Sequence, residues 1–547
     1  MLDARFSGLS QKYIQQLFDF HPEWAVSLGL HETYDGRSTA YDIRTIRREI
    51  TFHKQFLKSL SKIPATRLSR ENYFDYKIIR TGAESLLWKL ETLGEYRANP
   101  MMYIASLDVS GYIKRNYAPL SERLNSLINT QKSFPSIVAA AKRNLNKRLP
   151  VYAVETAMEM LDGTIKFLRT DLPPVVRRTD DKKLIAAFEK SNKKAIQAVD
   201  DYLKFLNKIL PDSHEGFAIG QNVFTKMLKS CEGLSLPISS LLERAWEELY
   251  RTKAELLDTA RAIAPDKSII EIERELKTHH AAEKTLVGDT ASMLEEMLAF
   301  VKSKHLVTVP ESLDLRVELT PKFLRWAFAM IDTPGAFDYL DTAFYYVTPA
   351  EDHWTDEQKN QWYQFFDHYT LRDISVHEAY PGHYVHFLKI KNECPSAIAK
   401  IFTTYTFIEG WAHYSEQLMV EAGYWAHDPR YYFAYLKESL IRIVRLIIAV
   451  KMHTMDMSVD DATFYFMRHA YMEEGPARKE AVRGTFDPGY GNYTLGKLMM
   501  LKLRDDYRTT MGQNFNLQSF HDQLLSYGAP PIPVMREILL GEEGSVL

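Results

Sequence analysis

Cysteine is scarce in this sequence of 547 residues, which contains only Cys231 and Cys394. The two are far apart and form no C-x-x-C pair, so we expect neither a disulfide framework nor a thiolate zinc site. An excess of charge of one sign is also missing, because 68 Lys and Arg residues face 71 Asp and Glu residues. A chain with so little net charge has no strong field to attract polyanions. We therefore expect no nucleic-acid partner.

Long apolar runs are absent as well. No window approaches the roughly 18 uninterrupted apolar residues that a membrane span needs, and the closest, Ile441 to Val450, contains Arg442 and Arg445. The amino terminus carries acidic residues and Lys12 and has no apolar stretch of the length found in signal peptides. These features predict a cytoplasmic protein without a membrane partner. They do not indicate an oligomeric state.

Helical periodicity is the dominant pattern in the chain. Apolar residues recur at spacings of three and four, as in Leu86, Leu90 and Leu93, and a hydrophobic content of 46% can fill a large core. We predict a mainly α protein with a helical amino-terminal region, 1–305, and a catalytic region, 306–547. The length is compatible with several domains, but we expect one continuous body. Long amphipathic helices are expected at 238–263 and 269–302.

Strand-forming residues are concentrated between Val307 and Pro349. Two segments there are rich in β-branched and aromatic residues and are bounded by proline, glycine and aspartate: V-T-V-P-E-S-L-D-L-R-V-E-L-T-P and A-F-D-Y-L-D-T-A-F-Y-Y-V-T-P. They predict a small sheet at the start of the catalytic region. An edge strand of this sheet could pair with an extended peptide. A purely structural hairpin is the alternative.

A histidine-rich motif follows the predicted sheet, with the sequence S-V-H-E-A-Y-P-G-H-Y-V-H-F from Ser375 to Phe387. Zinc peptidases commonly place two histidines four residues apart on one helix, with a glutamate between them as general base. Here His377 and His383 are six residues apart. On an ideal helix this spacing turns the second side chain by about 120° or more from the first.

The Pro381-Gly382 pair offers a way to correct that spacing. Proline removes a helix hydrogen bond and glycine accepts unusual dihedral angles, so a local bulge or kink could absorb two residues. We expect such a distortion, with His377 and His383 converging on a third ligand. Asp373 or Ser375 is the expected cap of the helix that carries His377.

The third ligand is expected on a following helix at about 399–422, in the segment F-I-E-G-W-A-H-Y-S-E-Q-L. Glu409, His413 and Glu416 lie at i, i+4 and i+7 and can face the same way. We predict Glu409 as the ligand, because two histidines and one carboxylate form a familiar catalytic zinc set, here with one Zn²⁺ per chain. Glu416 or His413 would then orient a ligand by hydrogen bonding. Single histidines and glutamates on helices are usually structural, and only their combination indicates a metal site.

A catalytic role follows for the glutamate beside the first histidine. With zinc bound, Glu378 would take a proton from water, and attack on a carbonyl would follow. Tyr493 and Arg483 are candidates for stabilising the oxyanion, because both lie near the glycine-rich segment G-T-F-D-P-G-Y-G-N-Y. A structural role is the alternative for both.

The motifs H-E-A-Y-P-G-H at 377–383 and E-G-W-A-H-Y-S-E at 409–416 resemble the paired signatures of the bacterial domain-of-unknown-function 885 family, which is similar to gluzincin zinc metallopeptidases. The resemblance covers nearly the whole chain. It implies a mainly helical single body with a small sheet beside the zinc helices. It also implies His377, His383 and Glu409 as ligands and Glu378 as base. The E-G-W-A segment is similar to N-E-G-F-A of zinc aminopeptidases, which favours Glu409 over Glu416 as the ligand.

Three positions depart from the family pattern. Tyr384 stands where relatives tend to have a second histidine, His413 where they commonly have an aliphatic residue, and Tyr490 where a glutamine is expected. The zinc set is unaffected, so these departures concern substrate contacts. We interpret the chain as a zinc-dependent peptidase acting on peptides. The alternatives are a zinc amidase or esterase acting on a small metabolite, and a non-enzymatic helical binding protein with a vestigial metal site.

Overall fold

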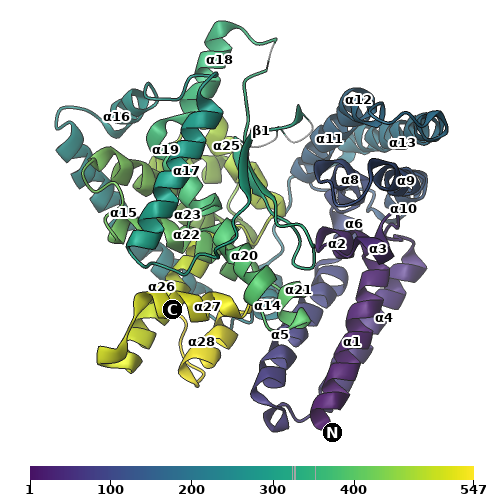
Figure 1. Ribbon diagram of the computed structural model, residues 1–547, viewed down its shortest axis with the longest axis horizontal. Helices are drawn as coiled ribbons and strands as arrows, with labels where there is room; N and C mark the ends of the chain where they lie inside the picture. The colour runs from purple at the N-terminus through teal and green to yellow at the C-terminus, as the bar shows by residue number, and fades with distance from the viewer. Residues whose placement is uncertain (323–324, 326–327, 352) are drawn as a thin grey trace. The chain divides into compact units, whose positions relative to one another are not determined.

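The computed structural model describes residues 1–322, 325, 328–351 and 353–547. Most of these residues are helical and one small sheet holds the strands, so the protein is mainly α, as predicted (Figure 1). The chain divides into two compact units. Unit 1 comprises Met1–Ile219 and the short segment Phe337–Leu340, and unit 2 comprises Gly220–Ala336 and Asp341–Leu547.

Unit 1 is built from amphipathic helices. In α1 the buried residues include Phe6, Tyr13 and Leu17, which recur at helical spacing and face the core of the unit. The longest helix, α13, begins after Asp181, whose carboxylate accepts the backbone N–H groups of Lys183 and Leu184. The helices of unit 1 are α1 (Leu2–Phe20), α2 (Pro22–Ser27), α3 (His31–Tyr34), α4 (Ile43–Leu60), α5 (Arg70–Leu87), α6 (Glu95–Ala98), α7 (Met101–Ile104), α8 (Gly111–Lys114), α9 (Leu120–Gln131), α10 (Phe134–Asn144), α11 (Val151–Lys166), α12 (Leu172–Val176) and α13 (Lys182–Ile209).

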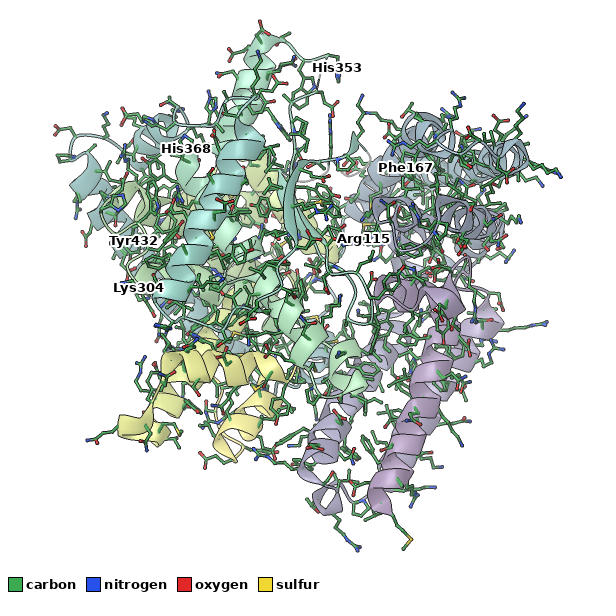
Figure 2. All side chains as sticks on the ribbon, in the orientation of Figure 1. Arg115, Phe167, Lys304, His353, His368 and Tyr432 are labelled. Atoms are coloured by element: carbon green, nitrogen blue, oxygen red, sulfur yellow. The ribbon has the colours of Figure 1, made fainter. Side chains whose placement is uncertain are left out.

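Unit 2 holds the predicted catalytic region except for Phe337–Leu340, and its helices surround one central helix, α23. This helix is buried along most of its length, and α15, α19 and α24 pack against it. Its helices are α14 (Gln221–Glu232), α15 (Ile238–Ile263), α16 (Ile269–Leu276), α17 (Leu286–Ser303), α18 (Asp356–Tyr363), α19 (His368–Glu378), α20 (His383–Glu393), α21 (Ala397–Ile401), α22 (Tyr405–Glu421), α23 (Pro429–Thr454), α24 (Val459–Ala470), α25 (Glu474–Phe486), α26 (Asn492–Met511), α27 (Leu517–Ser526) and α28 (Ile532–Leu540). Side chains fill the spaces between these helices in Figure 2, where His368 marks the start of α19 and Tyr432 lies on α23.

The division between the units does not coincide with the regions expected from the sequence. The expected regions met at residue 305, whereas the compact units meet at Gly220, because α15 packs along α23 and thereby joins unit 2. The single continuous body stays a prediction. The helix expected at 269–302 is also two helices, α16 and α17. The chain turns between them, and the backbone of His279 and His280 contacts that of Asp367 and His368.

The small sheet lies in unit 2, where the sequence indicated it. Its order is β1-β3-β2, with β3 (Ala343–Val347) in the centre, parallel to β1 (Leu315–Leu319) and antiparallel to β2 (Ala329–Asp332). Strand β3 is mostly buried, which its run of aromatic and β-branched residues explains. Strand β2 lies outside the two segments singled out in the sequence, and it forms one edge of the sheet.

The contact of α22 with α26 depends on two glycines. A Cβ atom on Gly410 would lie 2.6 Å from the Cα of Gly496, and one on Gly496 would lie 1.9 Å from the carbonyl oxygen of Thr406. Side chains at these positions would therefore separate the two helices. Because Gly410 follows Glu409, this contact also determines where Glu409 lies. Among the described residues, no helix has both the length and the apolar character that a membrane crossing demands.

Candidate metal centre

Helix α19 carries the first motif and begins earlier than expected. Its cap is Asp367, whose carboxylate accepts the backbone N–H groups of Tyr369 and Thr370. The predicted caps, Asp373 and Ser375, lie inside the helix and are buried. The Ser375 hydroxyl contacts the hydroxyl of Tyr345 at 2.7 Å, which ties α19 to β3.

The six-residue spacing of the histidines is accommodated by a complete break in the helix rather than by a bulge. Helix α19 ends at Glu378, the Tyr380–Pro381 peptide bond is cis, and α20 begins at His383. Gly382 is required here by close approach, because a Cβ atom would lie 1.9 Å from the carbonyl oxygen of His377. The indole N–H of Trp411 on α22 donates to the carbonyl of Pro381 at 2.9 Å. The break is therefore fastened to the helix that carries the third residue of the site.

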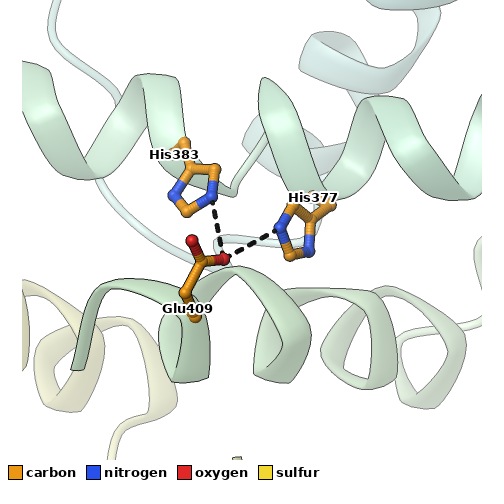
Figure 3. A group of neighbouring side chains, drawn as sticks. All are labelled: His377, His383 and Glu409. Carbon is orange, nitrogen blue, oxygen red and sulfur yellow. Dashed lines mark ion pairs between the residues drawn. The ribbon is translucent and has the colours of Figure 1, made fainter. Parts of the chain in front are cut away.

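The two histidines and Glu409 converge, as predicted. Figure 3 shows their side chains pointing toward one another from α19, α20 and α22. The Oε2 atom of Glu409 lies 3.4 Å from Nε2 of His377 and 3.5 Å from Nε2 of His383. One ligand atom from each residue falls within 4.8 Å of the other two, and both histidines are buried. We call His377, His383 and Glu409 the metal cluster.

The polar atoms and charges of the metal cluster fit a cation. Oε2 of Glu409 and Nδ1 of His383 are buried and have no hydrogen-bond partner among the described residues. Burial raises the pKa of Glu409, but the two imidazoles outweigh this and hold it well below its ordinary value. Burial lowers the pKa of His377, but its contacts with Glu409 and Glu416 outweigh this and raise it from 6.5 to about 10. The site therefore favours positive charge between its residues, and it could hold a metal ion.

A second set of polar side chains supports the metal cluster through the Nδ1 atom of His377. The carboxylate of Glu416 accepts a hydrogen bond from Nδ1 of His377 at 2.7 Å and one from Nδ1 of His413 at 2.9 Å. The guanidinium of Arg442 lies 3.2 Å from the same carboxylate. We call His413, Glu416 and Arg442 the Glu416 network. Because Glu416 accepts the Nδ1 proton of His377, Nε2 is the nitrogen directed into the metal cluster, and it would offer its lone pair to a metal ion that displaces its proton.

Asp373 lies one helical turn before His377 and adds an uncommon feature to this region. It is fully buried, and within the described part of the chain neither of its carboxylate oxygens has a hydrogen-bond partner. Burial, reinforced by the nearby charge of Glu416, raises the pKa of Asp373 well above its ordinary value. Burial therefore favours the neutral form of this side chain in the folded protein.

Glu378, the expected general base, lies at the end of α19 and faces the sheet. Its Oε2 atom accepts the backbone N–H of Ile331 in β2 at 3.4 Å. Ile331 therefore uses this N–H for a contact outside the sheet and not for pairing with β3. The edge of β2 thus borders the glutamate next to the metal cluster.

The two candidates for stabilising an oxyanion occupy different positions. The Tyr493 ring lies nearly parallel to the His377 ring, with centroids 6.1 Å apart, so Tyr493 borders the metal cluster. Arg483 donates instead to the Tyr405 hydroxyl at 3.1 Å and to Asp487. The Tyr405 ring packs edge-on against Tyr493. Arg483 is therefore linked to the site through Tyr405.

Several neighbours of the site were not identified from the sequence. Tyr405 lies four residues before Glu409 on α22, a helical spacing that could have indicated it. Arg442 was noted only as a charge within an apolar stretch, and such a charge is itself a signal that a buried carboxylate is close. The contact of Ile331 is made by its backbone, so no residue type could have indicated it.

Two solved structures with this fold match nearly the whole chain. A proposed lipoprotein of unknown function from Shewanella oneidensis has a TM-score of 0.81 and 24% sequence identity, with coverage of 98% of this chain and 99% of its own. A proposed lipoprotein from Colwellia psychrerythraea has a TM-score of 0.83 and 16% identity, with coverage of 99% of both chains. A carboxypeptidase from Pyrococcus furiosus matches at 11% identity over 92% of this chain and 96% of its own, but its TM-score of 0.35 supports no conclusion. No curated protein matches the sequence.

The first two structures correct one expectation from the sequence. Both are described as lipoproteins, which contradicts the cytoplasmic location predicted for this chain. That prediction was based on the missing apolar stretch near residue 1, and an absence of this kind does not determine where a protein resides.

The family of the chain, in contrast, is established by a match over most of the sequence. The model of the family described as bacterial protein of unknown function, or domain of unknown function 885, matches residues 22–539, which include both motifs and the entire metal cluster. The expected likeness to gluzincin peptidases stays a prediction. The chain belongs to the bacterial domain-of-unknown-function 885 family.

Proposed function

We propose that the protein is a zinc-dependent peptidase that hydrolyses peptide bonds in an extended substrate. The observation that carries this proposal is the convergence of His377, His383 and Glu409, with Glu378 next to His377 in the chain. Two imidazoles and one carboxylate form a common ligand set for catalytic zinc, and they leave room in its coordination shell. One Zn²⁺ per chain would supply Lewis acidity, which favours deprotonation of water and polarises a carbonyl.

The role of Glu378 follows from its surroundings. One of its oxygens accepts the N–H of Ile331, which fixes the carboxylate at the end of α19. The other oxygen can then take a proton from water and later deliver it to the leaving amine. Gln at this position would keep the size and the hydrogen bond but could not accept the proton.

The position of β2 favours a peptide over a small metabolite as the substrate. This strand is at the edge of the sheet, and its Ile331 N–H points toward Glu378. An extended peptide that paired with this edge would bring its backbone carbonyls close to the general base. Pairing of this kind uses main-chain atoms and is compatible with many side chains.

Tyr493 is the better-placed donor for the developing oxyanion. Its ring borders His377, and the half-buried guanidinium of Arg445, which is paired with Glu480, lies 5.4 Å from the ring centre. Arg483 would contribute indirectly through Tyr405.

The deciding experiment combines metal analysis with the Glu378→Gln variant. Full-length protein loaded with Zn²⁺ should cleave members of a peptide library more readily than amidase or esterase substrates. Glu378→Gln should keep one Zn²⁺ per chain and lose activity by about 10²-fold or more. Glu393→Gln, at the exposed end of α20, is the matched control and should behave as wild type. Full activity in Glu378→Gln would refute the mechanism, and protein that takes up no zinc would refute the metal site.

A further inference from the structure

Unit 1 contains a strongly basic pocket that has no part in the proposed peptidase site. It has a volume of about 580 Å³. Residues from α4, α6, the end of α10 and the residue before α4 line it: Asp42, Ile43, Arg44, Arg47, Tyr96, Arg97, Arg143 and Asn144. Four of these eight residues are arginines, and they come from three helices that are separated in the sequence. We call this the arginine pocket.

Within the part of the chain that the structure describes, the arginines of the pocket have no acidic partners. None of the four guanidinium groups makes an ion pair or a hydrogen bond to a carboxylate within the described residues. Arginines elsewhere in the protein, such as Arg251 and Arg445, are held by carboxylates at 2.7 Å. Among the described residues that line the pocket, Asp42 is the only acidic one. Its carboxylate already accepts the N–H groups of Arg44 and Thr45 at the start of α4, so its charge is engaged.

Hydrogen bonds to buried residues hold two lining residues of the pocket, Asn144 and Tyr96, which distinguishes it from a chance group of surface arginines. The side-chain amide of Asn144 donates to the carbonyl of Tyr41 and to the hydroxyl of Tyr103, and that hydroxyl donates to the carbonyl of Tyr96. The three tyrosines are buried. The guanidinium of Arg97 lies 5.2 Å from the centre of the Tyr96 ring, which orients it at the rim.

We propose that the arginine pocket binds a small ligand with two or more phosphate groups. Four guanidinium groups against one carboxylate leave an excess of three positive charges, which a single monoanion could not balance. Arginine binds phosphate through paired N–H donors, and a pocket of this volume is large enough for a phosphorylated small molecule. The chemistry is shared by a soluble polyphosphate ester and by the headgroup of a polyphosphorylated lipid.

The test is calorimetric titration of the full-length protein with inorganic tripolyphosphate. Wild type should bind one tripolyphosphate, more weakly as salt is added, because the arginines are exposed. The Arg44→Gln, Arg97→Gln double variant should bind at least about tenfold more weakly, because two charge-assisted contacts are lost. The Arg67→Gln, Arg169→Gln double variant removes two exposed arginines of unit 1 outside the pocket and is the control. It should bind as wild type does.

The controls make the result independent of the metal cluster and of folding. Tripolyphosphate also binds metal ions, but both double variants keep the metal cluster, so their difference reports the pocket alone. Equal melting temperatures would show that both variants are folded. Arg47→Gln with Arg143→Gln is a second pocket variant that should give the same loss. Absence of saturable binding to wild type, or equal binding by the pocket variants and the control, would overturn the proposal.

The source of the phosphate groups is distinguished by a vesicle assay. Phosphatidylcholine vesicles that contain phosphatidylinositol bisphosphate are compared with pure phosphatidylcholine vesicles and with soluble inositol phosphates. Binding to the first vesicles that the pocket variants lose identifies a lipid headgroup. Binding of the soluble compounds alone identifies a free phosphate ester. Either outcome supports the arginine pocket, and binding of neither class contradicts it.

Discussion

The metal cluster and the Glu416 network are neighbours on α22, yet their carboxylates are in opposite states. Glu416 accepts hydrogen bonds from two imidazoles and faces Arg442, so its charge is balanced by the protein itself. Glu409 faces two ring nitrogens at 3.4 and 3.5 Å, and its Oε2 has no hydrogen-bond partner among the described residues. A satisfied carboxylate such as Glu416, which is fully buried, positions its neighbours, whereas the less buried Glu409 has an unsatisfied oxygen that favours a cation. Glu416 thus supports the site and Glu409 is its candidate ligand, although the two residues lie within two turns of each other on α22.

Of the variants that test this comparison, Glu409→Gln should have the largest effect on metal binding. The amide keeps the volume of the side chain but loses its charge, and a neutral amide is a poor ligand for zinc. We expect metal content to fall to near zero and hydrolysis to be lost with it. Elemental analysis after dialysis, together with a peptide assay, measures both. A variant that keeps one zinc per chain would show that Glu409 is not a ligand.

Glu416→Gln should lower metal affinity less than Glu409→Gln does, but it should lower the stability of the fold more. Loss of the hydrogen bond that orients His377 is expected to weaken zinc binding about 10- to 100-fold without abolishing it. Arg442 would lose a buried partner, at an expected cost of about 3 to 5 kcal/mol in the free energy of unfolding. Competition with a chromophoric chelator gives the affinity, and urea unfolding gives the stability. Metal loss as complete as in Glu409→Gln would remove the distinction between the two carboxylates.

The break before His383 can be tested separately with Gly382→Ala. Its Cβ atom would overlap the carbonyl oxygen of His377, so α19 and α20 would have to move apart. We expect a loss of about 1 to 3 kcal/mol in stability and weaker zinc binding. Gly288→Ala on α17 is the control, because a Cβ atom there meets nothing within 4 Å. Thermal melting with and without zinc measures the change, and equal melting temperatures for the two variants would contradict this account of the break.

Much of the metal cluster could be predicted because its signal is local. His377, Glu378 and His383 lie within seven residues, and the spacing on α22 indicated Glu409 and Glu416. Long helices such as α15 and the position of the sheet were predicted from periodicity and residue type for the same reason. The spacing problem was also recognised at Pro381-Gly382. The form of its solution, two helices rather than one distorted helix, depends on the contact with Trp411 and could not be read from the motif.

Features formed by distant segments could not be predicted. The arginine pocket joins Arg44, Arg97 and Arg143, which are about 50 residues apart along the chain and show no common pattern. The contact of Ile331 with Glu378 is made through a backbone N–H. The boundary at Gly220 follows from the packing of α15 against α23. In each case tertiary packing determines the feature, and one sequence does not encode it in a local pattern.

The smallest expected effect concerns His521, a second buried group whose polar atoms both have hydrogen-bond partners. Its effect appears in how stability depends on pH. Its Nδ1–H donates to the carbonyl of Leu306, and its Nε2 accepts from the hydroxyl of Tyr414 on α22. Burial lowers the pKa of His521 from 6.5 to about 4. The unfolded chain therefore takes up a proton below about pH 6.5 that the folded chain refuses until about pH 4.

Stability should therefore fall as pH decreases through this window, and His521 should contribute about 1 kcal/mol over the first pH unit below 6.5. Urea unfolding at a series of pH values measures this slope. His521→Gln, which can still donate and accept, should flatten it, whereas His353→Gln at an exposed position should leave it unchanged. An equal slope in wild type and His521→Gln would show that His521 takes up its proton in the folded protein. Burial also lowers the pKa of His413 in the Glu416 network, to about 3. An equal slope would therefore also contradict the view that burial keeps such hydrogen-bonded imidazoles neutral.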